Sequence, residues 1–143
     1  MARDSFSFSV WGLQPRPQGS KKYVGMRRTA SGNNIPLIIE SSNQLPQWRK
    51  AIEQAILQGM VDSGDDSKFE GAVRVECIFY LRRPKTNRSE LPIVPPDTDK
   101  LARALLDSCK AVWGDDSQVV ELVAYKQWAL GEPGVQVSIT KML

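Results

Sequence analysis

The segment from Val73 to Leu81 carries the clearest structural pattern in this chain of 143 residues. Apolar side chains occupy every second position there, and Arg74 and Glu76 fall between them. Because successive side chains of a strand point to opposite faces of its sheet, this pattern predicts a strand with one face in the core. A single strand cannot bury its apolar face, so the rest of the chain has to supply further strands and a layer that covers them.

Five other segments have the composition or the alternation of strands, and they are residues 5–11, 23–26, 35–39, 119–128 and 135–139. The turn 31–34 joins the second and third of these segments, and the turn 131–134 joins the last two. Both turns are rich in residues that favour tight reversals of the chain, so we expect two hairpins.

Two segments show helical spacing. Apolar residues recur every three or four positions from Leu45 to Met60 and again from Leu101 to Val112. We therefore predict amphipathic helices over residues 43–61 and 98–112, ended by the glycines at positions 64 and 114. With the strands, they imply a single α+β domain over residues 1–143, in which two helices cover a mixed sheet. A chain of this length can form one core without disulfides.

Two segments cannot be regular because of their prolines. Residues 14–20 contain Pro15 and Pro17, and residues 82–96 contain four prolines. Proline has no backbone N–H to donate, which excludes it from the interior of a sheet. We interpret the first segment as a loop and the second as a flexible loop or arm that leads into Asp97.

Acidic residues are concentrated on both sides of the second predicted helix, at Asp97, Asp99, Asp115 and Asp116. The chain has no histidine and a net charge of +3, so this cluster stands on a basic background. Carboxylate oxygens are the ligands that magnesium prefers, and the sequence therefore indicates a divalent-cation site. Structural roles compete with this interpretation, because aspartate is also a common N-cap, first-turn and turn residue.

Four other side chains are candidates for the same site, each with an ordinary structural alternative. Arg103 lies one helical turn beyond Asp99, where its charge could stabilise a scissile phosphate, but a salt bridge to Asp107 would explain it as well. Lys126 is open to the same electrostatic role or to that of an exposed strand lysine. Glu76 is a weaker candidate on the strand that leads into the proline-rich segment.

Basic residues gather in two runs, one before the first predicted helix and one in the proline-rich segment. The two runs contain Arg16, Lys21, Lys22, Arg27, Arg28, Arg82, Arg83, Lys85 and Arg88. A polyanion is the natural partner for such runs, so we predict that they bind the phosphate backbone of DNA. For either run alone, a solvated charged face is the alternative.

Several classes of protein are disfavoured by what the sequence lacks. Without histidine, Ser-His-Asp, Cys-His and histidine-metal mechanisms lose an essential group, and no GxxxxGK[ST] motif indicates an NTPase. Cys77 and Cys109 have no CxxC spacing, so we expect buried thiols and no zinc site, with one disulfide as the alternative. Since no apolar run could span a membrane and no signal peptide is recognisable, we expect a cytoplasmic protein without a membrane partner.

The acidic segments also carry a family resemblance. The segment Pro96–Asp107 contains an acid, one further residue, a second acid and an apolar helix that leads to a third acid, and Asp-Asp-Ser-Gln-Val follows from position 115. Over residues 95–126 this order resembles the RusA family of Holliday junction resolvases. The resemblance implies a RusA-like homodimer and a magnesium-dependent endonuclease that nicks four-way DNA junctions symmetrically during recombination and repair, with Mn²⁺ able to substitute for Mg²⁺.

Carried onto this sequence residue by residue, the resemblance assigns metal binding to Asp97, Asp99 and Asp116. It also places Arg103 at the position of a catalytic lysine, which is a departure from the family's pattern. Arginine keeps the positive charge but does not readily lose a proton. The replacement leaves electrostatic stabilisation intact and argues against proton transfer from this position.

A second departure is Lys100, which stands where the family usually has asparagine. If the family's lysine must transfer a proton, Lys100 or Lys126 would have to do so here. The residues that we place around the metal ligands are therefore Asp107, Asp115, Lys100 and Lys126.

Two rival functions remain open on the sequence alone. One is a DNA-binding module without catalysis, in which the acids only cap helices and turns. The other is a magnesium-dependent nuclease for flaps, duplexes or single strands. Chelation of the metal separates the first rival from a nuclease, and a comparison of substrates separates the second from a junction resolvase.

Overall fold

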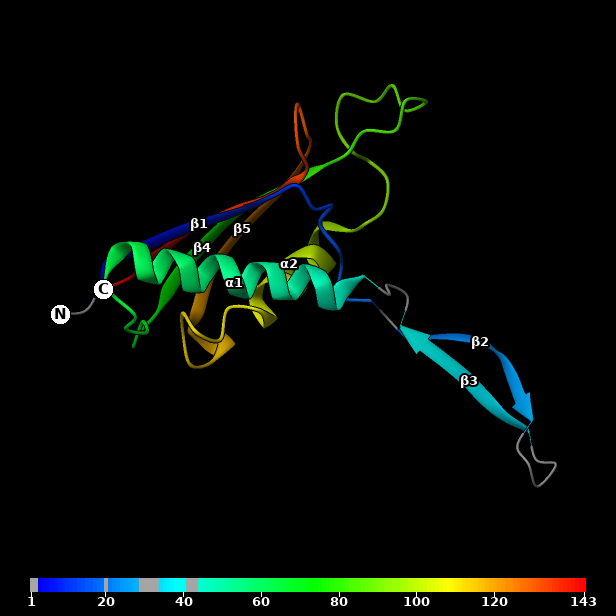
Figure 1. The fold of residues 1–143 in the computed structure, drawn as a ribbon, viewed down its shortest axis with the longest axis horizontal. Helices are drawn as coiled ribbons and strands as arrows, with labels where there is room; N and C mark the ends of the chain where they lie inside the picture. Colours follow the sequence, from blue (N-terminus) through cyan, green and yellow to red (C-terminus); the bar gives the residue numbers. More distant parts are fainter. Residues whose placement is uncertain (1–2, 20, 29–33, 41–43) are drawn as a thin grey trace.

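The computed structural model describes residues 3–19, 21–28, 34–40 and 44–143, with backbone alone for 21–28 and 34–40 (Figure 1). In chain order its elements are β1 (Ser5–Trp11), β2 (Lys21–Arg28), β3 (Asn34–Glu40), α1 (Leu45–Ser63), β4 (Val73–Leu81), α2 (Thr98–Asp107), the 3₁₀ turn η1 (Asp116–Gln118), β5 (Val119–Trp128) and β6 (Gly134–Lys141). The α+β class and the two helices agree with the prediction.

The main sheet has four strands in the order β1-β6-β4-β5. β4 pairs in parallel with β5, whereas β6 pairs antiparallel with both β4 and β1. The sheet is therefore mixed, as predicted. The parallel pair requires a crossover connection, and the segment that contains α2 supplies it.

The predicted hairpin between residues 119–128 and 135–139 is wrong. Both strands form, but β4 lies between them, and Ala129 donates its backbone N–H to the Leu81 carbonyl as the chain passes the end of β4. Burial explains the order. Val135, Val137 and Ile139 of β6 are buried and suit an inner strand, whereas every residue of β5 is exposed or half-buried, which suits an edge.

Both helices pack on one face of this sheet, α1 near β1 and α2 near β5 (Figure 1). The core lies between the layers. Val75, Cys77 and Phe79 of β4 and Ile52 and Ile56 of α1 have no exposed surface. Burial of each such aliphatic or aromatic side chain contributes about 1.5–3 kcal/mol, so the alternation of β4 holds the two layers together.

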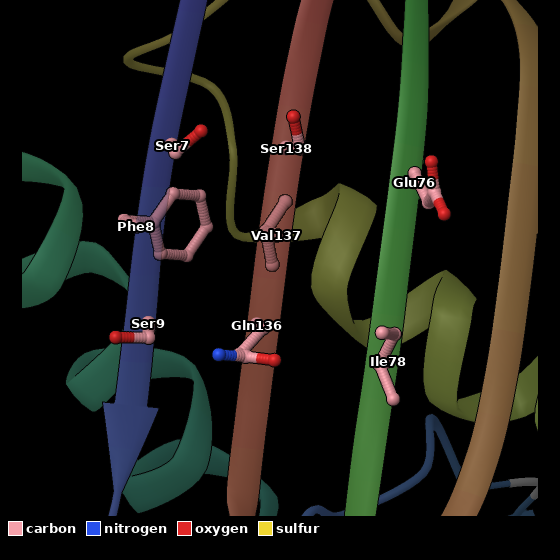
Figure 2. Close-up of a pocket in the computed structure, with 8 residues that line it drawn as sticks. All are labelled: Ser7, Phe8, Ser9, Glu76, Ile78, Gln136, Val137 and Ser138. Atoms are coloured by element: carbon pink, nitrogen blue, oxygen red, sulfur yellow. The ribbon is translucent and has the colours of Figure 1, made fainter.

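No helix of the described residues lies over the other face of the sheet. Figure 2 shows cross-strand rows on this face, in which Ser7 and Glu76 flank Ser138, and Ser9 and Ile78 flank Gln136. These residues line a shallow depression of about 550 Å³. Glu76 lies here with its carboxylate 3.0 Å from the Arg74 guanidinium, so it faces away from the helices.

α1 ends at Ser63, and Gly64 follows with a positive φ of 69°, which fits the predicted glycine end. Gln44 occupies the N-cap position of α1, and its side chain makes no capping hydrogen bond. No helix in the described part of the chain is both long and apolar enough to cross a membrane.

α2 ends at Asp107, several residues before the predicted end at Val112. Ser108 donates its hydroxyl to the Ala104 carbonyl at 2.9 Å, and the following backbone N–H groups bond three residues back, which tightens the chain. Phe69 then donates its N–H to the Val112 carbonyl and pairs with Trp113 in a short bridge. Cys109 and Val112 follow the helical spacing because they are buried in the core, although they lie beyond the end of the helix.

β2 and β3 form the predicted hairpin as a separate antiparallel ribbon, which extends away from the sheet and helices in Figure 1. Asn34 begins β3 and does not belong to the turn, and residues 29–33 lie outside the described residues. Residues 14–19 and 82–96 form no helix or strand, as their prolines predicted.

Cys77 and Cys109 are buried free thiols, as expected, and form no disulfide with each other. Burial raises the pKa of Cys77 to about 12, and it raises that of Cys109 as well. Both thiols are therefore protonated at neutral pH, which suits core residues and not nucleophiles.

Candidate active site

Three carboxylates line a cavity of about 540 Å³ between α2, η1 and β5. Asp99 and Asp107 come from α2, and Asp116 comes from the first position of η1. Arg103 lies between the two helical acids and lines the same cavity. Residues four apart on a helix share one face, which is why positions 99, 103 and 107 all reach this space.

The apolar lining of the cavity comes from Ala102, Leu106 and Leu122. Leu122 belongs to β5, so the edge strand forms one boundary. The opposite face of α2, with Leu101, Ala104 and Leu105, is buried in the core. The helix is therefore fixed by its apolar face and presents its charged face to the cavity.

Asp97 occupies the N-cap position of α2 but does not line the cavity. Its backbone is extended, and its side chain makes no capping hydrogen bond. One carboxylate oxygen lies 3.8 Å from the Lys100 ammonium, three residues along the chain, and both side chains are largely exposed. The structure therefore does not bring Asp97 together with Asp99 and Asp116, and its role as a metal ligand stays a prediction.

Two donors hold Asp116 in place. The Lys110 ammonium lies 2.8 Å from its Oδ1, and the indole N–H of Trp113 donates to the same oxygen at 2.9 Å. Within the described residues, Oδ2 of Asp116 accepts no hydrogen bond. The hydrogen bond from Lys110 also raises the pKa of that lysine, which keeps it charged.

Asp115 has a structural role. Its carboxylate accepts the backbone N–H of Ser117 at 2.8 Å, and the Gln118 side chain accepts the N–H of Asp115 at 3.1 Å. These contacts form a capping box at the start of η1. The hydrogen bonds from Ser117 lower the pKa of Asp115. Asp116 is therefore the member of this acidic pair that reaches the cavity.

The donor set of the cavity fits a hard divalent cation. Among the side chains that the structure describes, no group of three from His, Cys, Asp or Glu stands close enough together to hold an ion. Magnesium, however, usually keeps several waters and takes one or two protein carboxylates. Asp99 and Asp116 supply two carboxylates from different elements, and the cavity has room for bound water.

The salt bridge predicted between Arg103 and Asp107 is not among the ion pairs of the described residues. Arg103 is exposed and Asp107 is half-buried, and both line the cavity. The electrostatic role of Arg103 toward a phosphate stays a prediction.

Lys126 neither lines the cavity nor extends from its strand into solvent, which were the two alternatives for this residue. Its ammonium donates hydrogen bonds to the Val94 and Pro96 carbonyls at 2.8 and 3.0 Å, and its side chain is half-buried. It is thus not an exposed strand lysine, and it does not line the cavity. Glu76 is also excluded from this site, because it lies on the open face of the sheet (Figure 2).

The predicted DNA-binding residues fall in three places. Arg82, Arg83, Lys85 and Arg88 are exposed on the 82–96 loop. Arg16 is half-buried in the loop after β1. Lys21, Lys22, Arg27 and Arg28 belong to β2, and their side chains lie outside the described part.

Sequence reasoning missed two residues next to the acids. Lys110 falls inside the predicted helix 98–112 and Trp113 directly after it, and the sequence predicted no contact of either residue with Asp116. The early end of α2 turns both toward Asp116. The only signal for this contact was their short separation from Asp116, and such proximity in sequence is common.

Comparison with protein families identifies a match over most of the chain. The model of the family described as "Endodeoxyribonuclease RusA" matches residues 14–140 of this chain. The matched range begins in the loop after β1, ends within β6 and includes every residue that lines the cavity. A search of curated proteins found no match.

Proposed function

Because the chain belongs to the RusA family of endodeoxyribonucleases, we propose that it resolves four-way (Holliday) junctions in DNA by magnesium-dependent hydrolysis of phosphodiester bonds. The observation that supports this proposal most directly is that Asp99, Asp116 and Arg103 line one cavity. Acidic side chains that can bind a metal ion and an arginine that stays positively charged suit phosphodiester hydrolysis, because negative charge develops on the phosphate during the reaction.

Each residue of the cavity has a distinct task in this proposal. Asp99 and Asp116 hold the magnesium ion, and Asp97 joins them when its carboxylate leaves Lys100. When bound, the ion neutralises phosphoryl oxygens and lowers the pKa of an attacking water. Arg103 donates its planar N–H groups to a phosphate oxygen, a geometry that arginine fits better than lysine does. Arginine remains protonated, so its part is electrostatic.

The exposed basic residues of the 82–96 loop approach the DNA backbone in this proposal, together with Arg16 and the β2 residues. Phosphate contacts by lysine and arginine release counterions, so binding weakens as salt rises. Replacing Arg83 or Lys85 should reduce the slope of log K against log salt by about one for each lost contact.

We also propose that the active form is a homodimer. A two-fold axis would place one cavity on each of two opposed strands of the junction, which explains how symmetric nicks arise. Sedimentation velocity should then give twice the mass of one chain. A monomer at the concentrations that support cleavage would contradict this part of the proposal.

The main test uses a synthetic four-way junction with Mg²⁺ or Mn²⁺. The wild-type protein should give paired nicks, and EDTA should abolish them while binding persists. Asp99→Asn should bind the junction but cut it on the order of 10³-fold more slowly, because a metal ion contributes several kcal/mol to transition-state stabilisation. Asp66→Asn is the matched control, since Asp66 is exposed and distant in sequence from the cavity.

The same assay distinguishes the rival functions. Binding without any metal-dependent cutting would indicate a DNA-binding module. Equal cutting of flaps, duplexes, single strands and four-way junctions would indicate a nuclease of broader specificity. Cleavage by Asp99→Asn at the wild-type rate would reject the proposed site.

A further inference from the structure

The 82–96 loop has no helix or strand, yet side chains of β5 hold it at three points. The Lys126 ammonium donates to the Val94 carbonyl at 2.8 Å and to the Pro96 carbonyl at 3.0 Å. The indole N–H of Trp128 donates to the Ser89 carbonyl at 2.8 Å. The loop is therefore attached to the edge strand along its second half. This attachment differs from the freely flexible arm that its composition suggested.

The two donors belong to one face of β5 because they are two residues apart. Lys126 pairs in register with Phe79, and Trp128 pairs with Leu81, so both extend from the face that packs against the helices. Trp128 packs against the core, which fixes the direction of its N–H. We call Lys126 and Trp128 the β5 clasp.

The backbone of the 82–96 loop is irregular, so its carbonyl groups need hydrogen-bond donors from elsewhere, and the clasp supplies them. Carbonyl groups outside a helix or sheet have no ladder partner, and a buried or half-buried carbonyl without a donor is costly. Lysine usually extends its ammonium into water, so a half-buried lysine that bonds two carbonyls holds those carbonyls in a defined position. A charged donor also forms stronger hydrogen bonds than a neutral one does.

The clasp joins two functional parts of the chain. Pro96, which it holds, directly precedes Asp97 and the first turn of α2 that carries Asp99. At the other end of the loop, the Gln14 side chain accepts the backbone N–H of Arg82 at 2.9 Å. The exposed basic residues of the loop lie between this bond and the clasp.

We propose that Lys126 and Trp128 are positioning residues that fix the 82–96 loop and the start of α2 for DNA cleavage. Lys126 thus acts through the backbone at positions 94 and 96, and it neither contacts the scissile phosphate nor transfers a proton. This inference rests on the proposed nuclease function for its effect on cleavage. Its effect on the loop can be measured without any activity.

The test compares Lys126→Met, Lys126→Arg and Trp128→Phe with the wild-type protein. Methionine keeps much of the length but removes the donors, arginine retains donors, and phenylalanine keeps a ring while removing the N–H. Lys141→Met is the matched control, because Lys141 is an exposed lysine on β6 of the same sheet. Limited trypsin digestion reports on the loop, where cleavage after Arg88 is followed by mass spectrometry.

Lys126→Met should be cut after Arg88 about tenfold faster or more, because it loses two hydrogen bonds from a charged donor. Trp128→Phe should be cut several-fold faster, and Lys126→Arg and Lys141→Met should resemble the wild type. In junction cleavage, Lys126→Met should lower kcat by about tenfold at saturating Mg²⁺, and Lys126→Arg should recover most of that loss. The pH profile of kcat should keep its shape, since no proton-transfer group is removed.

Three outcomes would overturn the inference. Unchanged digestion after Arg88 in both Lys126→Met and Trp128→Phe would show that the clasp does not hold the loop. Faster digestion with unchanged kcat would show that the loop position does not matter for cleavage. Loss of kcat in Lys126→Arg as complete as in Lys126→Met, with an altered pH profile, would indicate proton transfer. If the wild type fails to cut junctions, the nuclease proposal fails while the digestion result still decides whether the clasp exists.

Discussion

The two acidic pairs that flank α2 look alike in the sequence but differ in the structure. In both pairs the first residue precedes a helical element and the second lines the cavity. Asp115 uses its carboxylate to cap η1, whereas Asp97 stands at the N-cap of α2 without a capping bond. The difference shows that an aspartate at an N-cap position does not always use its carboxylate for a capping hydrogen bond. The carboxylate of Asp97 makes no capping hydrogen bond, whereas that of Asp115 bonds the backbone of η1.

The largest expected effect separates Asp116 from its neighbour. Asp116→Asn should lower junction cleavage on the order of 10³-fold, because the amide replaces a proposed metal ligand. Asp115→Asn should change cleavage by less than about threefold, since asparagine caps a helical turn as well as aspartate does. Single-turnover kinetics at saturating protein measures both. Equal losses in the two variants would break the comparison.

A second experiment asks whether Asp97 joins the site. Asp97→Asn keeps a good N-cap but removes the charge, so a purely structural residue would tolerate it. We expect cleavage to fall by about 10²-fold or more and the Mn²⁺ concentration for half-maximal activity to rise, because a carboxylate ligand has been lost. Wild-type rates in this variant would leave Asp97 as a helix-start residue alone.

The contacts of Asp116 predict a smaller effect on metal affinity. Lys110 and Trp113 both hold Oδ1, and loss of such a supporting contact typically costs 10- to 100-fold in metal affinity or activity. Trp113→Phe removes the N–H without a change of charge, so it should weaken Mn²⁺ binding within this range. Titration of Mn²⁺ by electron paramagnetic resonance measures it, and a thermal melt shows whether this core substitution leaves the fold intact.

Lys110→Met should weaken Mn²⁺ binding less than Trp113→Phe does, because it also removes a positive charge that opposes the ion. Lys110→Arg should stay near the wild-type affinity, since it keeps both the donor and the charge. Tighter binding by Trp113→Phe than by the wild type would show that these contacts restrain Asp116 without preparing it for a metal.

The smallest expected effect is the dependence of stability on pH. Hydrogen bonds from Ser117 lower the pKa of Asp115 below its ordinary value of 3.8. The folded state therefore gains stability from this carboxylate above pH 3.8, and the gain is lost as pH falls through the lowered pKa. Asp115→Asn does not titrate, so the difference in urea midpoint between it and the wild type should change between pH 7 and pH 3. An identical difference at the two pH values would argue against the cap.

Local pattern predicted the elements better than their arrangement. The bounds of β1, β4 and β5 were predicted from alternation and turn residues, because those signals lie within each segment. The position of β4 between β5 and β6 was not, since strand order depends on contacts between distant segments. The end of α2 was missed because a buried, apolar turn gives the same periodicity as a helix.

The site shows the same limit. The acids at positions 99 and 116 were predicted as ligands, and the structure places both at one cavity. Which of the two adjacent aspartates faces inward could not be derived from composition, because it depends on the backbone bond from Ser117. The role of Lys126 was also hidden, since its partners are carbonyl groups, and carbonyl groups carry no sequence signal.

The parallel pairing of β4 and β5 has a consequence for how this protein can vary. Every residue that lines the cavity belongs to one uninterrupted stretch, residues 99–122, which runs from the crossover helix into the edge strand. The spacing among these acids is therefore independent of the length of the preceding loop. Insertions or deletions in the loop before α2 can therefore change the surface that contacts DNA without changing the spacing of the cavity residues. Such changes are tolerated because lengthening a surface loop costs little free energy.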